Sequence, residues 1–336
     1  MCFFLKNLNA QGKCVVEFDR IMSNPTYAKV QEGAKLAREN HVDLILAVGG
    51  GSVSDCCKVI SAQANLNEDI WEMQYTKHTL PTKFIPLGTI VTLFGTGSEM
   101  NNGAVITHEE KKIKGALWGA QAEFAFLDPA YSLSVPMQQV ISGAFDTLSH
   151  AMETYFGKPD ENNLSDDINE AVMRSVIRNI RILLTDPENY DARSELAWAS
   201  AMAENGILKI GKVTDFQAHQ IQHQFGAYTN CNHGAGLAVI HPVLYRHIYK
   251  SGTARFTCWA QNVWGIAPKG SDGETAAGID ALADFIREIG LPTTFTELGI
   301  PADTDFRAIT DSTNVTAGCC KKLTRDEICE ILQECL

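Results

Sequence analysis

Two patterns of hydrophobic and polar positions alternate between residues 14 and 107. Short apolar runs at 14–19, 42–48 and 84–87 indicate buried strands. The stretches 27–40 and 53–64 instead carry apolar residues at helical spacing. Strands that alternate with helices in this order predict an open parallel sheet of the Rossmann-like kind, with right-handed crossovers.

The pattern changes after Leu127-Asp128-Pro129. From Pro136 onward the spacing is helical almost throughout, and Ser134 is the expected N-cap of the first helix. We therefore predict two domains, an α/β domain over residues 1–130 and an all-α domain over residues 131–336. The further helices are expected at residues 164–184, 190–208, 215–228, 234–249, 273–289 and 324–334.

Composition and net charge exclude some classes of binding partner. The chain has 336 residues, enough for two domains, and a net charge of −12. Such an acidic surface repels phosphate backbones and anionic lipid, so nucleic acid and membrane are not expected as partners. The ten cysteines include no CxxC pair, which favours reduced thiols in the cytoplasm.

Two glycine-containing stretches follow predicted strands. In Gly49-Gly50-Gly51-Ser52 the backbone can approach a ligand, and the free N–H groups of the following helix favour a pyrophosphate. This is not the usual GxGxxG fingerprint, and the alternative is a tight strand-to-helix turn. The segment 92–99 carries two glycines and several hydroxyls that could bind phosphate or ribose. Taken alone, this second stretch is better explained as a polar turn.

Histidines are enriched in one part of the predicted helical domain. Asp146 and His150 are one helical turn apart, His219 and His223 repeat that spacing, and His233 follows. Three imidazoles and one carboxylate suit a divalent transition metal such as Fe²⁺ or Zn²⁺. Spacing does not decide which two of the three later histidines bind, and a lone Asp/His pair is usually a surface or capping feature. A metal together with a dinucleotide suggests an oxidoreductase.

The motifs resemble, in their order along the chain, the iron-dependent (group III) alcohol dehydrogenase family. The resemblance runs from about residue 14 to the end, and its details are similar to the butanol dehydrogenase and NADPH-dependent aldehyde reductase branch. It implies a dehydroquinate synthase-like fold with the active site between the two domains. The matching motifs are Gly49-Gly50-Gly51-Ser52-x-x-Asp55-x-x-Lys58, Thr96-Gly97-Ser98-Glu99, Asp146-x-x-x-His150, His219-x-x-x-His223, His233-Gly234, Asn24-Pro25, Leu127-Asp128-Pro129 and Pro187-Glu188-Asn189-Tyr190-Asp191.

The resemblance also implies roles for single residues. The metal ligands would be Asp146, His150, His219 and His233, whereas His223 would lie by the nicotinamide and the substrate as a catalytic residue. The expected contacts with NADP or NAD are Gly50, Gly51, Ser52, Asp55, Thr92, Leu93, Thr96, Ser98, Lys114 and Ser134.

We therefore expect a cytoplasmic, homodimeric, metal-dependent alcohol dehydrogenase or aldehyde reductase that uses Fe²⁺ or Zn²⁺. A lyase of the dehydroquinate synthase type is disfavoured, because no Lys/Arg cluster lies near the metal motifs apart from the more distant Lys209 and Lys212. The family's opening strand-loop-helix unit, which contacts the adenosine half of the cofactor, is absent. Weak binding and poor discrimination between NADH and NADPH are expected, and a catalytically impaired remnant with a structural or partner-binding role is the alternative.

Overall fold

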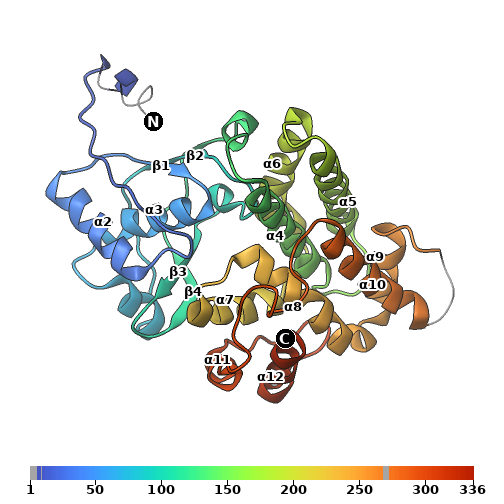
Figure 1. The fold of residues 1–336 in the computed structure, drawn as a ribbon. Coiled ribbons are helices and arrows are strands. Elements are labelled where there is room, and N and C mark those ends of the chain that lie inside the picture. The colour runs from blue at the N-terminus through green and yellow to red at the C-terminus, as the bar shows by residue number, and fades with distance from the viewer. Residues whose placement is uncertain (1–5, 9, 268–271) are drawn as a thin grey trace.

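The computed structural model describes residues 6–8, 10–267 and 272–336, and it has an α/β part followed by a helical part. Figure 1 shows the sheet with its helices at one end of the molecule and the helical part at the other. The predicted fold class is confirmed. The elements of the α/β part are α2 (Tyr27–Glu39), β1 (Ile45–Gly49), α3 (Gly51–Gln63), η1 (Glu72–Thr76), β2 (Leu87–Val91), η2 (Ser98–Met100), β3 (Gly103–His108), β4 (Ile113–Trp118), β5 (Phe124–Phe126) and η3 (Pro129–Ser132).

The sheet is parallel, as expected, with the strand order β1-β2-β5. Every residue of β2 is buried because this strand is central. The strand expected at 84–87 begins only at Leu87, since Pro86 has no N–H to donate to a ladder. The expected strand at 14–19 is wrong. Those residues lie outside the sheet of the described chain and pair with no strand, and an apolar run without a hydrogen-bonding neighbour does not form one.

A two-stranded antiparallel hairpin, β3–β4, was not expected from the sequence. It packs against α3 and, on the other side, β4 contacts α7 of the helical part. The hairpin therefore forms a second connection between the two parts of the molecule, besides the peptide that joins them.

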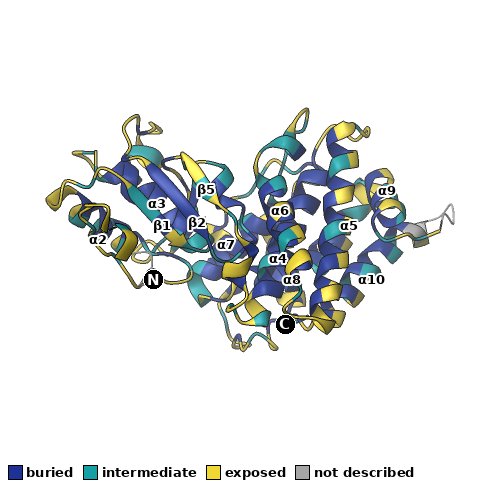
Figure 2. Ribbon diagram, turned by 90° about the horizontal axis from the view of Figure 1, so that it is seen from above, coloured by how far each residue is buried: buried dark blue, intermediate teal, exposed yellow. Residues whose placement is uncertain are grey.

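The helical part buries one large apolar core that includes Phe145, Leu148, Phe225 and Trp259. Figure 2 shows the buried faces of its helices turned toward one another. The six helices expected beyond the first are all present, and α9 and α11 are additional. The elements are α4 (Met137–Tyr155), α5 (Leu164–Thr185), α6 (Tyr190–Glu204), η4 (Ile207–Lys209), α7 (Gln217–Thr229), α8 (His233–Ile248), η5 (Tyr249–Ser251), α9 (Thr253–Asn262), α10 (Asp272–Glu288), α11 (Phe306–Ser312) and α12 (Arg325–Glu334).

The expected N-cap role of Ser134 is wrong. Helix α4 begins at Met137, and the residue at its N-cap position is Pro136, which has no side-chain oxygen. Ser134 lies exposed in the preceding turn. The fixed φ of Pro136 starts the helix without a polar cap.

The two parts meet where the loop after β2 lies against α4. A Cβ on Gly143 would overlap the carbonyl oxygen of Phe94, and one on Gly95 would lie 2.7 Å from the carbonyl oxygen of Gly143. Thr147 Oγ1 donates to the Gly95 carbonyl over 3.1 Å. Ser200 Oγ on α6 accepts from the Gly95 N–H over 2.9 Å. Backbone-to-backbone contact of this kind requires glycine on both sides.

Gly143→Ala is predicted to destabilise the fold. Alanine normally stabilises a helix relative to glycine, but here the methyl group would push the loop at Phe94 away. We expect a net loss of about 1–3 kcal/mol, the usual cost of overpacking. Urea unfolding followed by tryptophan fluorescence measures it. The control is Gly103→Ala, where the nearest atoms to a new Cβ are 3.5 Å away. Equal midpoints for the two variants would contradict the close contact.

Candidate metal centre

Three helices bring the predicted metal-binding side chains together. Asp146 and His150 lie on α4, His219 on α7, and His233 is the first residue of α8. Ligand atoms of Asp146, His150 and His219 lie within 4.8 Å of one another. Asp146 Oδ1 is 3.5 Å from His219 Nε2, 3.4 Å from His233 Nε2 and 3.9 Å from His150 Nε2.

The atoms that face one another in this cluster lack ordinary partners. Asp146 Oδ1 and His219 Nε2 are both buried, and neither has a hydrogen-bond partner in the described part of the chain. Buried polar atoms are nearly always paired, so two of them converging on one point call for a ligand between them. One carboxylate oxygen and three imidazole nitrogens form a donor set that fits Fe²⁺ or Zn²⁺.

Two further side chains orient the imidazoles, and the sequence reasoning missed both. Glu153 Oε2 accepts a hydrogen bond from His219 Nδ1, and Gln222 Oε1 accepts one from His233 Nδ1. Both bonds leave the Nε2 atoms facing Asp146. A signal was present, because Glu153 and Gln222 each follow a predicted metal residue by three positions and so lie on the same helical face.

Burial and the charges of neighbouring groups both shift the pKa values of the residues in this cluster. Burial alone would raise the pKa of Asp146, but the imidazoles of His150 and His233 pull it well below its usual range. Burial would also lower the pKa of His219, yet the carboxylates of Glu153 and Asp146 raise it to about 9. His233 responds mainly to burial, which lowers its pKa to about 4. At each of these groups, burial and the neighbouring opposite charges therefore shift the pKa in opposite directions.

His223 lies beside this cluster. Its ring stacks on that of His233 with centroids 5.3 Å apart, and it lies edge-on to His219 at 5.8 Å. Burial, together with the nearby ammonium of Lys114, holds the pKa of His223 well below its usual range. The imidazole is therefore neutral, with one ring nitrogen that donates a hydrogen bond and one that accepts.

The two glycine-containing loops lie at the same edge of the sheet, because β1 and β2 are adjacent and parallel. The Thr92 N–H donates to the Gly49 carbonyl over 2.9 Å, which joins the loops. A Cβ on Gly51 would lie 2.9 Å from Thr96 Cβ, so this position needs glycine for close packing. Ligands of open α/β sheets bind at this edge. The expected cofactor residues that remain partly exposed here are Gly50, Gly51, Ser52, Thr92, Leu93 and Thr96.

Asp55 and Ser98, two other expected cofactor residues, are buried and bonded to each other. Ser98 Oγ donates to Asp55 Oδ1 over 2.5 Å, and the Val105 N–H donates to Asp55 Oδ2 over 2.8 Å. Burial raises the pKa of Asp55. Both carboxylate oxygens are thus engaged by the protein, which ties α3 to η2 and to β3.

Lys114, on β4, is buried where the hairpin meets α7. Its Nζ donates to Asn24 Oδ1 over 2.8 Å, and Asn24 Nδ2 donates to Asn230 Oδ1 over 2.9 Å. Burial lowers the pKa of Lys114 to about 8. The positive charge of Lys114 in turn adds to the lowering of the pKa of His223 and of His233.

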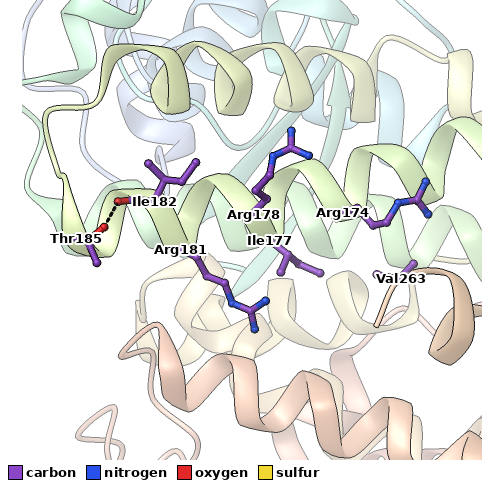
Figure 3. Close-up of a pocket in the computed structure, with 7 residues that line it drawn as sticks. All are labelled: Arg174, Ile177, Arg178, Arg181, Ile182, Thr185 and Val263. Carbon is purple, nitrogen blue, oxygen red and sulfur yellow. Dashed lines mark hydrogen bonds between the residues drawn. The ribbon is translucent and has the colours of Figure 1, made fainter. Parts of the chain in front are cut away.

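A groove of about 490 Å³ lies on the outer side of α5, away from these residues. Figure 3 shows that its arginines do not converge, since Arg178 and Arg181 point to opposite sides of the helix. Arg181 is held by Glu288 through two bonds of 2.7 Å, and Arg174 Nη1 donates to the Asn262 carbonyl over 2.8 Å. Although this groove is large, the buried polar side chains that could bind a ligand lie at the histidine cluster.

Comparison with known proteins identifies the family. Residues 4–129 match the model for "Iron-containing alcohol dehydrogenase", and residues 140–336 match that for "Fe-containing alcohol dehydrogenase family, C-terminal". The chain belongs to the iron-containing alcohol dehydrogenase family. The expected oxidoreductase with an iron-type metal and a nicotinamide cofactor is thereby confirmed, as is the expected two-part fold.

Individual members of the iron-containing alcohol dehydrogenase family are similar over most of the chain. NADH-dependent butanol dehydrogenase A of Clostridium acetobutylicum is 36% identical, over 85% of this chain and 75% of its own. NADPH-dependent aldehyde reductase YqhD of Escherichia coli is 35% identical, over 86% of this chain and 76% of its own. The crystal structure of NADH-dependent butanol dehydrogenase A from Thermotoga maritima has a TM-score of 0.93 at 30% identity, covering 98% of this chain and 86% of its own.

Within residues 6–8, 10–267 and 272–336, none of the helices combines the length and the apolar character that crossing a bilayer requires.

Substitution of two neighbouring histidines tests the assignment of ligands. His219→Ala should lose bound metal and activity, because it removes a nitrogen that faces Asp146 Oδ1. His223→Ala should keep the metal but turn over more slowly, since its ring lies beside the cluster. Metal content by mass spectrometry, measured with steady-state rates, separates the two. Equal loss of metal in both variants would show that the ligands are assigned wrongly.

Proposed function

We propose that the chain interconverts short-chain aldehydes and alcohols with a nicotinamide cofactor as the hydride carrier. The observation that carries the proposal is the buried cluster in which Asp146 Oδ1 and the Nε2 atoms of His219 and His233 face one another. The similarity to butanol dehydrogenases and to an aldehyde reductase supports the choice of substrate class.

The proposed metal ligands are Asp146, His150, His219 and His233. An ion held by these residues would supply Lewis-acid polarisation of the substrate oxygen. The residues of the chain orient the metal-binding imidazoles and exclude water from the site. Glu153 and Gln222 hold two imidazoles in place through their Nδ1 atoms, and the surrounding helices keep the carboxylate out of water.

His223 is the proposed catalytic residue. Its neutral imidazole lies next to the His233 ring, in a position to pass a proton between the substrate oxygen and solvent. The simpler alternative is that His223 is a hydrogen-bonding neighbour of the ligands. The two roles differ in their effect on turnover when metal content is unchanged.

The residues that the sequence predicts to contact NAD or NADP divide into two groups. The partly exposed loop residues Gly50, Gly51, Ser52, Thr92, Leu93 and Thr96 can reach a bound dinucleotide. Asp55, Ser98 and Lys114 are buried and bonded within the protein, so we propose that they hold the loops and the hairpin in place. Ser134 remains a proposed contact from the turn before α4. The proposed boundary between the cofactor-binding and metal-binding domains is near residue 130.

We propose a homodimer in the cytoplasm. The described cysteines are free, which fits a reducing compartment. One face of the sheet exposes Val48, Phe124 and Phe126 at 40%, 42% and 59%, and an apolar patch of this kind favours burial against a second copy. Light scattering of the purified protein should give twice the mass of 36.8 kDa. A monomer at micromolar concentration would contradict the dimer.

Removal of the metal should abolish the proposed activity reversibly. The purified chain is expected to oxidise NADH or NADPH in the presence of butanal, to lose this activity on dialysis against a chelator, and to regain it with Fe²⁺ or Zn²⁺ under anaerobic conditions. Absorbance at 340 nm follows the reaction. Metal-loaded protein that binds NAD(P)H yet reduces no short aldehyde would refute the function.

A further inference from the structure

We propose that Glu153 is a positioning residue of the metal centre, which fixes the His219 ring and supplies the second buried negative charge that a divalent cation needs. The inference rests on the proposed metal site. It assigns part of the metal affinity to a carboxylate that does not face the ion.

Glu153 joins the two helices that carry most of the proposed ligands. It lies on α4, seven residues after Asp146, and its side chain is buried. Its carboxylate accepts hydrogen bonds from the Ala218 N–H over 2.7 Å, from the His219 N–H over 3.2 Å, and from His219 Nδ1. All three donors belong to the first turn of α7.

The start of α7 explains why a side chain from another helix is needed. The N-cap residue is Phe216, whose φ of 54° is left-handed and whose side chain has no oxygen. In the described residues its side chain makes no capping bond, so the first N–H groups of α7 would stay unpaired. Glu153 takes the place of the cap, and its negative charge suits the positive end of the helix dipole.

The same carboxylate selects one tautomer of His219. Because Nδ1 donates to Glu153, the neutral ring keeps its proton on Nδ1, and Nε2 is the nitrogen whose lone pair a cation can take. That Nε2 lies 3.5 Å from Asp146 Oδ1 and has no hydrogen-bond partner among the described residues. Backbone and ring bonds to one carboxylate therefore fix the helix, the ring and the direction of the lone pair together.

Charge balance gives Glu153 a second effect. A divalent ion buried beside Asp146 alone would leave one positive charge uncompensated, which is costly in a helical core. Glu153 supplies the second negative charge next to His219. Glu204, another acidic residue near His150, is neutralised by Lys209 at 2.9 Å. Gln222 orients His233 in the same manner as Glu153 orients His219, but without a charge.

Glu153→Gln separates the two kinds of role. The amide oxygen can still accept from the Ala218 N–H, but the charge is lost and one acceptor becomes a donor. We expect the affinity for Zn²⁺, measured by chelator competition on the metal-free chain, to fall about 10- to 100-fold. Thermal unfolding of the metal-free protein, measured in parallel, reports the contribution of the cap. A variant that unfolds earlier but binds Zn²⁺ as tightly as the wild type would overturn the proposal.

Glu170→Gln is the matched control. Glu170 is also a buried carboxylate of the helical part, and it accepts from Tyr155 Oη over 2.8 Å and from Asn262 Nδ2 over 2.9 Å. Its substitution should leave Zn²⁺ affinity unchanged. If Glu153→Gln does not fold, Glu153→Asp keeps the charge but withdraws it by one methylene, and an unchanged affinity for Zn²⁺ then overturns the positioning role. A wild-type chain that binds no divalent metal would instead refute the proposed metal centre itself.

Discussion

The close approach of two backbones, at Gly95 and Gly143, sets the geometry on which both halves of the site depend. Gly143 is one helical turn before Asp146 on α4, and Gly95 precedes Thr96 in the loop that packs on Gly51. A displacement at this contact would therefore move the metal carboxylate relative to the cofactor loops. Hydride transfer is sensitive to about an ångström of misplacement, so a rigid backbone contact suits this boundary better than a flexible side-chain interface.

Burial of the metal cluster depends on the apolar core behind it. Asp146 and Glu153 are each almost inaccessible, and such carboxylates cost several kcal/mol to bury unless they are paired. Helix α4 offsets this with residues such as Phe145 and Leu148, which are fully buried and contribute roughly 1.5–3 kcal/mol each. The ligands and the core residues alternate along the same helix. A long helix with two differently used faces can therefore hold a charged site within an apolar bundle.

Local periodicity predicted most of the helices and the parallel sheet, because apolar spacing reflects which face of an element is buried. It failed at 14–19, where the residues have strand character but no strand beside them. It also missed the β3–β4 hairpin. The cluster of Asp146 with the later histidines could be expected from residue types and motif order. The spacing from His150 places Glu153 on the ligand face of its helix, but its role could not be assigned, since its partners are 65 and 66 positions away and are chosen by the crossing of α4 and α7.

The glycine motif that begins α3 has two halves with different consequences. Its first half, at Gly50 and Gly51, keeps side chains out of the space between the loops. Its second half anchors the hairpin, because Asp55 accepts from the Val105 N–H and the fully buried Lys58 donates to the Gly103 carbonyl over 2.7 Å. The hairpin in turn places Lys114 beside α7, near the metal cluster. The motif that the sequence predicts as a pyrophosphate loop thus also determines, through β3 and β4, where the charge of Lys114 lies relative to His223.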